Sequence, residues 1–112
     1  MRNHFLLVLA FFVSCNVLAQ SPKYEFRAAW LATVSNIDWP DIEHDRTATE
    51  QQQALTAIFD KYAAGNMHAC CLQVRSLSDA MYNSSYEPWS ESLTGTRGKD
   101  PGYDPLAFAI EE

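Results

Sequence analysis

The residues best placed to do chemistry begin at Arg75, which ends the short apolar run 69–75 and opens a long polar segment. The run, Ala-Cys-Cys-Leu-Gln-Val-Arg, predicts a buried β-strand because it is short and almost continuously apolar. Alternate strand residues point to opposite faces, so Gln73 and Arg75 share a face that becomes polar toward its end. Parallel α/β enzymes hold their sites beyond the carboxyl ends of their strands, where this guanidinium would lie.

About thirty residues lie between Arg75 and the next helix signal at Asp104. A segment of this length without a helix or strand pattern is uncommon in compact domains unless it serves a site. We therefore interpret it as one wall of an active-site cleft. Its acidic, aromatic and hydroxyl side chains are those of Asp79, Tyr82, Tyr86, Glu87, Trp89, Ser90 and Thr94.

The elements that must position Arg75 form a βαβ pattern. Residues 25–34 predict a first strand, because the run is short, apolar at its centre and β-branched at its end. Thr47 and Glu50 have the spacing of a capping box at a helix start. Gly65 is suited to the left-handed position that ends a helix. One apolar stripe lies between these signals, formed by Leu55, Ile58, Phe59 and Tyr62.

Asp104 and Pro105 predict the start of another helix, with an acidic cap and a proline in the first turn. Two strands and these helices cannot close a core, because parallel sheets need cover on both faces and neighbours at both edges. The predicted fold class is therefore α/β, with residues 20–112 forming the N-terminal part of a larger domain.

The charge balance limits the possible partners. The sequence has 8 Lys and Arg against 14 Asp and Glu, a net charge of −6. This excess of acid, without any basic cluster, argues against nucleic acid and anionic membrane surfaces. Neither the histidines nor the adjacent Cys70 and Cys71 have metal-ligand spacing. We assign no metal and no cofactor, and interpret the two thiols as buried side chains that act as small apolar groups.

Residues 1–19 have the pattern of a secretory signal peptide. Arg2 supplies a positive start, and residues 5–13 form an apolar core too short to span a bilayer. Val-Leu-Ala then provides small residues before a cut, which predicts cleavage between Ala19 and Gln20.

Lipidation of Cys15 is the alternative for this leader. The residues Val-Ser-Cys at 13–15 are lipobox-like, although Phe12 fits that pattern poorly. Both possibilities predict a protein exported to the periplasm, the cell envelope or the medium. The signal-peptide interpretation leaves no integral membrane segment after cleavage.

Three blocks occur in order along the chain: PKYEFRAAWLATVSNIDWP, LQVRSLSDAMYNSSYEPWSESLTG and YDPLAFAIEE. Together they resemble the opening of the bacterial glycosyl-hydrolase-like family 10 domain. The resemblance covers nearly all residues after the leader. It implies a (β/α)8 TIM barrel in an exported protein that hydrolyses glycosidic bonds in envelope polysaccharides, including peptidoglycan glycan strands. Members usually have proline directly after Gln-Val-Arg, where this chain has Ser76.

A TIM barrel needs about 250 residues, so this chain would supply only its first βαβ portion. The resemblance places the catalytic carboxylates in later strands, beyond residue 112. We therefore assign no catalytic residue and expect the chain by itself to be inactive. The rival hypothesis is a non-catalytic glycan-binding protein or degenerate barrel remnant.

Six residues at or beyond the predicted strand ends are candidates for glycan binding. Arginine offers planar donors to sugar hydroxyls, and aromatic rings suit sugar C–H faces. Structural alternatives stay open: an Arg75–Asp79 ion pair, a local turn cap by Asp38, core packing of the tryptophans, and a plain surface position for Glu87. The candidates are Asp38, Trp39, Arg75, Asp79, Tyr82 and Trp89.

Overall fold

The computed structural model describes residues 25–44 and 47–112. The predicted leader, its cleavage site after Ala19 and the alternative lipidation at Cys15 lie outside the described residues. None of the helices in the described ranges combines the length and apolarity that crossing a bilayer requires.

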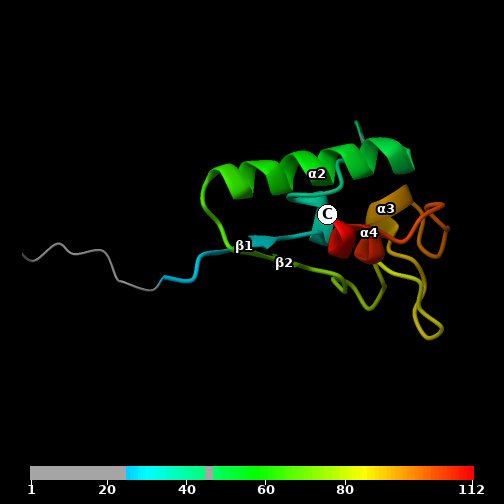
Figure 1. Cartoon of the computed structure of the whole chain (residues 1–112). Helices are drawn as coiled ribbons and strands as arrows, with labels where there is room; N and C mark the ends of the chain where they lie inside the picture. Colours follow the sequence, from blue (N-terminus) through cyan, green and yellow to red (C-terminus); the bar gives the residue numbers. More distant parts are fainter. Residues whose placement is uncertain (1–24, 45–46) are drawn as a thin grey trace, which may run out of the picture.

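The described chain is a mixed α/β unit built on two parallel strands (Figure 1). The register places Ala28 opposite Ala69 and Leu31 opposite Leu72. The connecting helix packs along one face of the strands, as the βαβ pattern predicts. The elements are β1 (Ala28–Leu31), η1 (Val34–Asn36), α2 (Ala48–Ala64), β2 (Ala69–Leu72), α3 (Glu91–Thr94) and α4 (Pro105–Glu111).

Both ends of α2 are determined locally. The predicted capping box is present, because the Glu50 amide donates to Thr47 Oγ1 and the Thr47 amide donates to the Glu50 carboxylate. The prediction for Gly65 is wrong, since its φ is −80°. Asn66 takes the left-handed conformation instead, and the Met67 amide donates to the Tyr62 carbonyl. Asparagine tolerates this conformation, so the helix ends in a Schellman turn one residue later than predicted.

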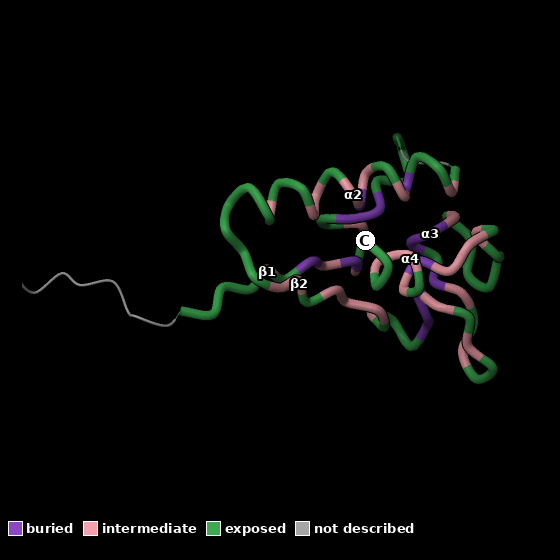
Figure 2. Tube along the Cα trace, in the orientation of Figure 1, coloured by how far each residue is buried: buried purple, intermediate pink, exposed green. Residues whose placement is uncertain are grey.

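The core lies between α2, the facing side of the strands and the long segment after β2 (Figure 2). The apolar strand face predicted at 70, 72 and 74 packs against it, which confirms that part of the pattern. The long segment is more ordered than predicted, because it contains α3 and a parallel bridge between Ala80 and Trp89. The buried members of the core are Leu31, Trp39, Leu55, Met81 and Leu93.

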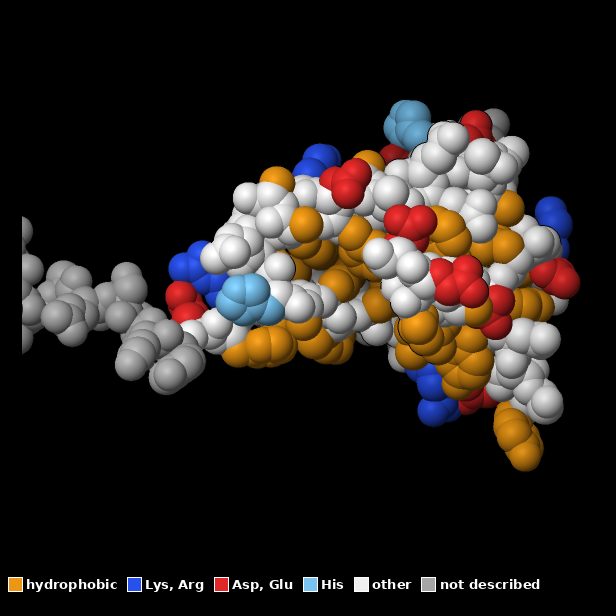
Figure 3. Space-filling model, viewed as in Figure 1, with side chains coloured by type: hydrophobic (Ala, Val, Ile, Leu, Met, Phe, Trp, Pro, Cys, Tyr) orange, Lys and Arg blue, Asp and Glu red, His pale blue; other side chains and the backbone are white. Residues whose placement is uncertain are grey.

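A second apolar surface lies open between α2, β2 and α4 (Figure 3). It forms a groove of about 540 Å³. The partly buried side chains of Phe59, Cys70 and Leu72 line its floor. Ile110 of α4, which is 75% exposed, stands at its edge.

The opposite face of the sheet has no cover from the described residues. Trp30, which pairs in register with Cys71, is 66% exposed, and Phe26 just before β1 is 76% exposed. Cys71 is exposed as well, so within the described residues the prediction of a strand buried on both faces, with two buried thiols, is wrong for this face. Open edges and an apolar face together favour association with other chains.

We expect residues 20–112 expressed alone to self-associate, and Trp30→Thr to reduce that association, because Trp30 dominates the uncovered face. Sedimentation velocity across a concentration series measures the effect. Tyr86→Ser is the matched control, since Tyr86 is an aromatic 96% exposed on the loop. Equal effects of the two substitutions would contradict a role for the sheet face.

Candidate functional site at the carboxyl ends of the strands

The carboxyl ends of the two parallel strands lie on the same side of the sheet, which we call the carboxyl edge. The segments that follow the strands there carry all six predicted binding residues. η1 and α3 are in contact at this edge (Figure 1). Both strands are shorter than the predicted ranges 25–34 and 69–75. The strands are shorter because side-chain hydrogen bonds take the place of backbone pairing beyond Leu31 and Leu72. These hydrogen bonds also determine the shape of the edge.

The Gln73 side chain accepts the hydrogen bonds that a neighbouring strand would accept if the sheet continued. Its Oε1 accepts hydrogen bonds from the amides of Thr33 at 3.0 Å and Val34 at 3.1 Å. Thr33, which is fully buried, donates from Oγ1 to the Gln73 carbonyl at 2.8 Å. Because the donors of Thr33 and Val34 are satisfied, the chain leaves the sheet after Leu31 without orphaned amides.

Asp38 closes the loop that follows β1. Its Oδ2 accepts from the Ala32 amide at 2.8 Å, and its own amide donates to the Ala32 carbonyl at 3.1 Å. The carboxylate therefore caps a residue six positions earlier instead of its own local turn. Its role is to hold the loop as a closed ring beside β1.

Trp39 is 1% exposed, so of its two predicted roles the structure shows core packing. Its indole donates from Nε1 to the Gln51 carbonyl at 3.0 Å. Gln51 is itself buried and donates from Nε2 to the Leu93 carbonyl at 2.6 Å. Its Oε1 accepts from the Tyr103 hydroxyl at 2.9 Å. These hydrogen bonds join α2 to both loops of the edge.

Asn36 joins η1 to α3. Its Nδ2 donates to the Ser92 carbonyl at 2.8 Å and also to the Pro40 carbonyl. Ser35 and Asn36 both have left-handed backbones, with φ of 52° and 53°. Such conformations are unfavourable for residues with a side chain and persist where the surroundings determine them. The two hydrogen bonds of the Asn36 side chain hold these backbone conformations in place.

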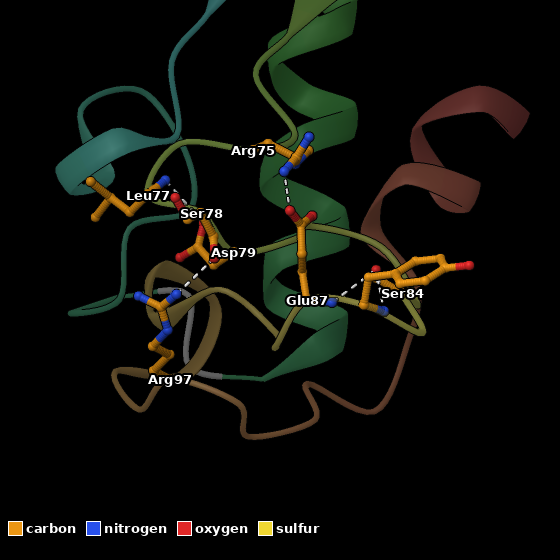
Figure 4. Close-up of polar contacts among 8 residues, drawn as sticks. Arg75, Leu77, Ser78, Asp79, Ser84, Glu87 and Arg97 are labelled. Carbon is orange, nitrogen blue, oxygen red and sulfur yellow. Dashed lines mark hydrogen bonds and ion pairs between the residues drawn. The ribbon is translucent and has the colours of Figure 1, made fainter.

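Arg75 forms an ion pair with Glu87 across the long loop (Figure 4). The guanidinium side chain is 56% exposed, whereas the Glu87 side chain is 18% exposed. Ser84 Oγ accepts from the Glu87 amide at 3.2 Å, which anchors the acid's backbone. The alternative of a plain surface position for Glu87 is therefore wrong, because its side chain is mostly buried and pairs with Arg75.

Asp79 is not the partner of Arg75, so that alternative is wrong. The carboxylate is 1% exposed and turns back to accept from the Leu77 amide at 3.2 Å. Arg97 crosses from the other side of the loop and donates to the Ser78 carbonyl at 2.7 Å (Figure 4). Asp79 and Arg97 thus stabilise the turn after Arg75.

Tyr82 and Trp89 are both partly exposed. Trp89 packs against the core, and its carbonyl accepts from the Gly98 amide at 2.8 Å. A glycan contact for either ring stays a prediction. None of the six predicted residues, all of which lie in the described ranges, is hydrogen-bonded or ion-paired to another of the six.

The shifted pKa values belong to groups outside the six predicted residues. Burial raises the pKa of the Cys70 thiol and of the Tyr62 hydroxyl, so both stay protonated at neutral pH. The hydrogen bond with the His44 ring lowers the pKa of Asp41. Within residues 25–44 and 47–112, no three His, Cys, Asp or Glu side chains gather as metal ligands would.

The residues that organise this edge have amide side chains, to which the sequence analysis gave no binding role: Asn36, Gln51 and Gln73. One signal was available for Gln73, a polar side chain within an apolar strand. Buried polar groups have hydrogen-bond partners, so such a residue indicates a structural contact. Nothing in the sequence identified Thr33 and Val34 as those partners.

The family described as glycosyl hydrolase-like 10 matches residues 25–112. Glycosyl hydrolase YngK of Bacillus subtilis (strain 168) is 44% identical over 108 residues, which make up 96% of this chain and 21% of that protein. Glycosyl hydrolase DigH of Escherichia coli (strain K12) is 35% identical over 99 residues, 83% of this chain and 23% of that protein. The chain thus spans between a fifth and a quarter of the length of these relatives.

We expect Gln73→Leu to speed hydrogen exchange at the amides of Thr33 and Val34 by about 5- to 150-fold, because each loses an acceptor worth about 1–3 kcal/mol. Exchange measured by NMR on the folded protein that carries this chain tests it. Gln73→Glu is the matched control, since it keeps the acceptor oxygen and should exchange more slowly than Gln73→Leu. Unchanged exchange in Gln73→Leu would show that these hydrogen bonds do not hold the loop.

Proposed function

The chain belongs to the glycosyl hydrolase-like 10 family, and on that premise we propose that it is the N-terminal part of an exported enzyme that hydrolyses O-glycosidic bonds. The proposed substrate is a polysaccharide of the bacterial envelope, such as the glycan strand of peptidoglycan. Family membership together with the ordered polar edge beyond two parallel strands carries this proposal.

We further propose that these residues are the first βαβ portion of a (β/α)8 barrel. In such a barrel the helices cover the outside, while the inner strand faces meet one another. The placement of α2 on one face of β1 and β2 fits the outer layer. The uncovered face with Trp30 and Cys71 fits the barrel interior.

Glycoside hydrolysis needs two carboxyl groups across the scissile bond, one to protonate the leaving oxygen and one to act as nucleophile or base. Three carboxylates of this edge are already engaged: Asp38 and Asp79 accept from backbone amides, and Glu87 binds Arg75. The family resemblance implies a catalytic pair in later strands, beyond residue 112, and these three engagements support that proposal. The described loops would hold the glycan beside it.

The same engagement of the acids supports one alternative, a glycan-binding protein without hydrolysis. Release of reducing ends from purified peptidoglycan distinguishes the two functions. The enzyme hypothesis expects release by the full protein and none by residues 20–112 alone. Binding without release by the full protein would favour the alternative, and release by the short chain would refute the proposed position of the acids.

We expect Arg75→Ala in the full protein to lower kcat/KM on a glycan substrate by roughly 5- to 150-fold, the effect of losing a charged hydrogen bond of about 1–3 kcal/mol. The half-exposed guanidinium stands at the carboxyl end of β2, within reach of a substrate. Steady-state kinetics measures this change.

Arg97→Ala is the matched control, because Arg97 bonds a loop carbonyl and should affect turnover less. Arg75→Lys should recover part of the activity, since it keeps the charge but not the planar donors. If Arg75→Ala loses thermal stability but keeps its kcat/KM, the role of Arg75 is structural, through its ion pair with Glu87, and it does not contact the substrate.

We expect the exported protein to begin at Gln20, because Val-Leu-Ala follows a short apolar core. Intact-mass measurement of protein from the natural host, or N-terminal sequencing, tests this. Cys15→Ala should leave export and the new N-terminus unchanged. A lipid-modified N-terminus at Cys15 in the unaltered protein would overturn the prediction.

A further inference from the structure

A hollow of about 320 Å³ lies at the carboxyl edge of the strands, between η1 and α3. Small-ligand sites in proteins begin at roughly this size, about 300 Å³. Its walls come from the segments after both strands, so it lies on the face where the proposed enzyme would hold its substrate. The lining residues are Ser35, Asn36, Ile42, Leu77, Glu91, Ser92 and Gly95.

The polar lining of the hollow consists of hydrogen-bonding groups and one negative charge. Within the described residues, the side chains of Ser35 and Glu91 have no hydrogen-bond or ion-pair partner, and both residues are exposed. Ser92, by contrast, is buried, and its carbonyl is held by Asn36. The hollow therefore presents the Ser35 hydroxyl and the Glu91 carboxylate to a ligand, beside a backbone that the Asn36–Ser92 hydrogen bond holds in place.

The apolar lining lies beside these groups. Leu77 is 53% exposed and Ile42 is 39% exposed. Figure 4 shows Leu77 on the side of the loop that faces η1, away from the Arg75–Glu87 pair. The Leu77 amide donates a hydrogen bond to the Asp79 carboxylate, so this apolar wall has a defined position.

We propose that this hollow binds one uncharged sugar unit of the glycan and disfavours acidic units. A carboxylate accepts hydrogen bonds from neighbouring sugar hydroxyls with two oxygens, and the serine hydroxyl both donates and accepts. The C–H face of the ring would contact Leu77 and Ile42. No Lys, Arg or His lines the hollow, so a uronic or other acidic unit would meet Glu91 without compensation.

This inference rests on the proposed function for the choice of ligand class. The test uses the full protein and two probes, a β-linked N-acetylglucosamine trimer and a galacturonic acid trimer, with affinities from isothermal titration calorimetry. The unaltered protein should prefer the neutral trimer. Glu91→Gln should lower that preference by about tenfold, because the repelling charge is gone while the side-chain shape is kept.

Leu77→Ser should weaken the neutral trimer without changing the preference, because it removes apolar contact and no charge. Glu111→Gln is the matched control, an exposed acid at the far end of α4 that is absent from the hollow. Hydrogen exchange at Thr33 and Val34 checks that the edge stays folded in each variant.

An unchanged preference in folded Glu91→Gln, or no binding of either trimer, would overturn the proposed subsite. Release of reducing ends by the unaltered protein is scored separately. Hydrolysis with an unchanged preference would leave the enzyme proposal standing and remove the subsite. A shifted preference without hydrolysis would support the subsite and refute the enzyme proposal.

Discussion

The hydrogen bonds from Thr33 and Val34 to the Gln73 side chain are the constraint on which the carboxyl edge depends. A strand that leaves its sheet exposes amides, and each buried amide without an acceptor costs about 1–3 kcal/mol. Gln73 supplies one oxygen to two such amides, so β1 can end at Leu31 and turn into η1. The loop beyond this turn is held by Asp38, which bonds Ala32, and by Asn36, which bonds Pro40 and Ser92.

The same solution recurs wherever the edge lacks regular structure. Asn36 binds the carbonyls of Pro40 and Ser92, and Gln51 binds the Leu93 carbonyl while receiving the Tyr103 hydroxyl. Loops carry backbone groups that no ladder satisfies, and an amide side chain can serve as donor and acceptor at once. The loops therefore pack as part of the core, to which they contribute Trp39, Met81 and, from α3, Leu93.

The acidic side chains at this edge differ in how they are engaged. Asp38 and Asp79 accept from backbone amides and Glu87 pairs with Arg75, whereas the side chains of Glu91 and Ser35, beside the hollow, have no such partner among the described residues. A rigid wall with few free groups can select a ligand without acting on it. In the proposed enzyme, this division would let later strands supply the carboxylates while these loops orient the glycan.

The sequence by itself determined the features that depend on neighbours three or four residues apart, or on alternation along a strand. The Thr47 capping box, the Leu55 stripe, the apolar face of β2 and the Asp104 cap at α4 are of this kind. Only the tertiary structure decided that Arg75 pairs with Glu87, that Trp39 is buried, and that Gln73 binds Thr33, 40 positions away. Periodicity and capping are local properties of the backbone, whereas these contacts depend on where the folded loops bring distant side chains together.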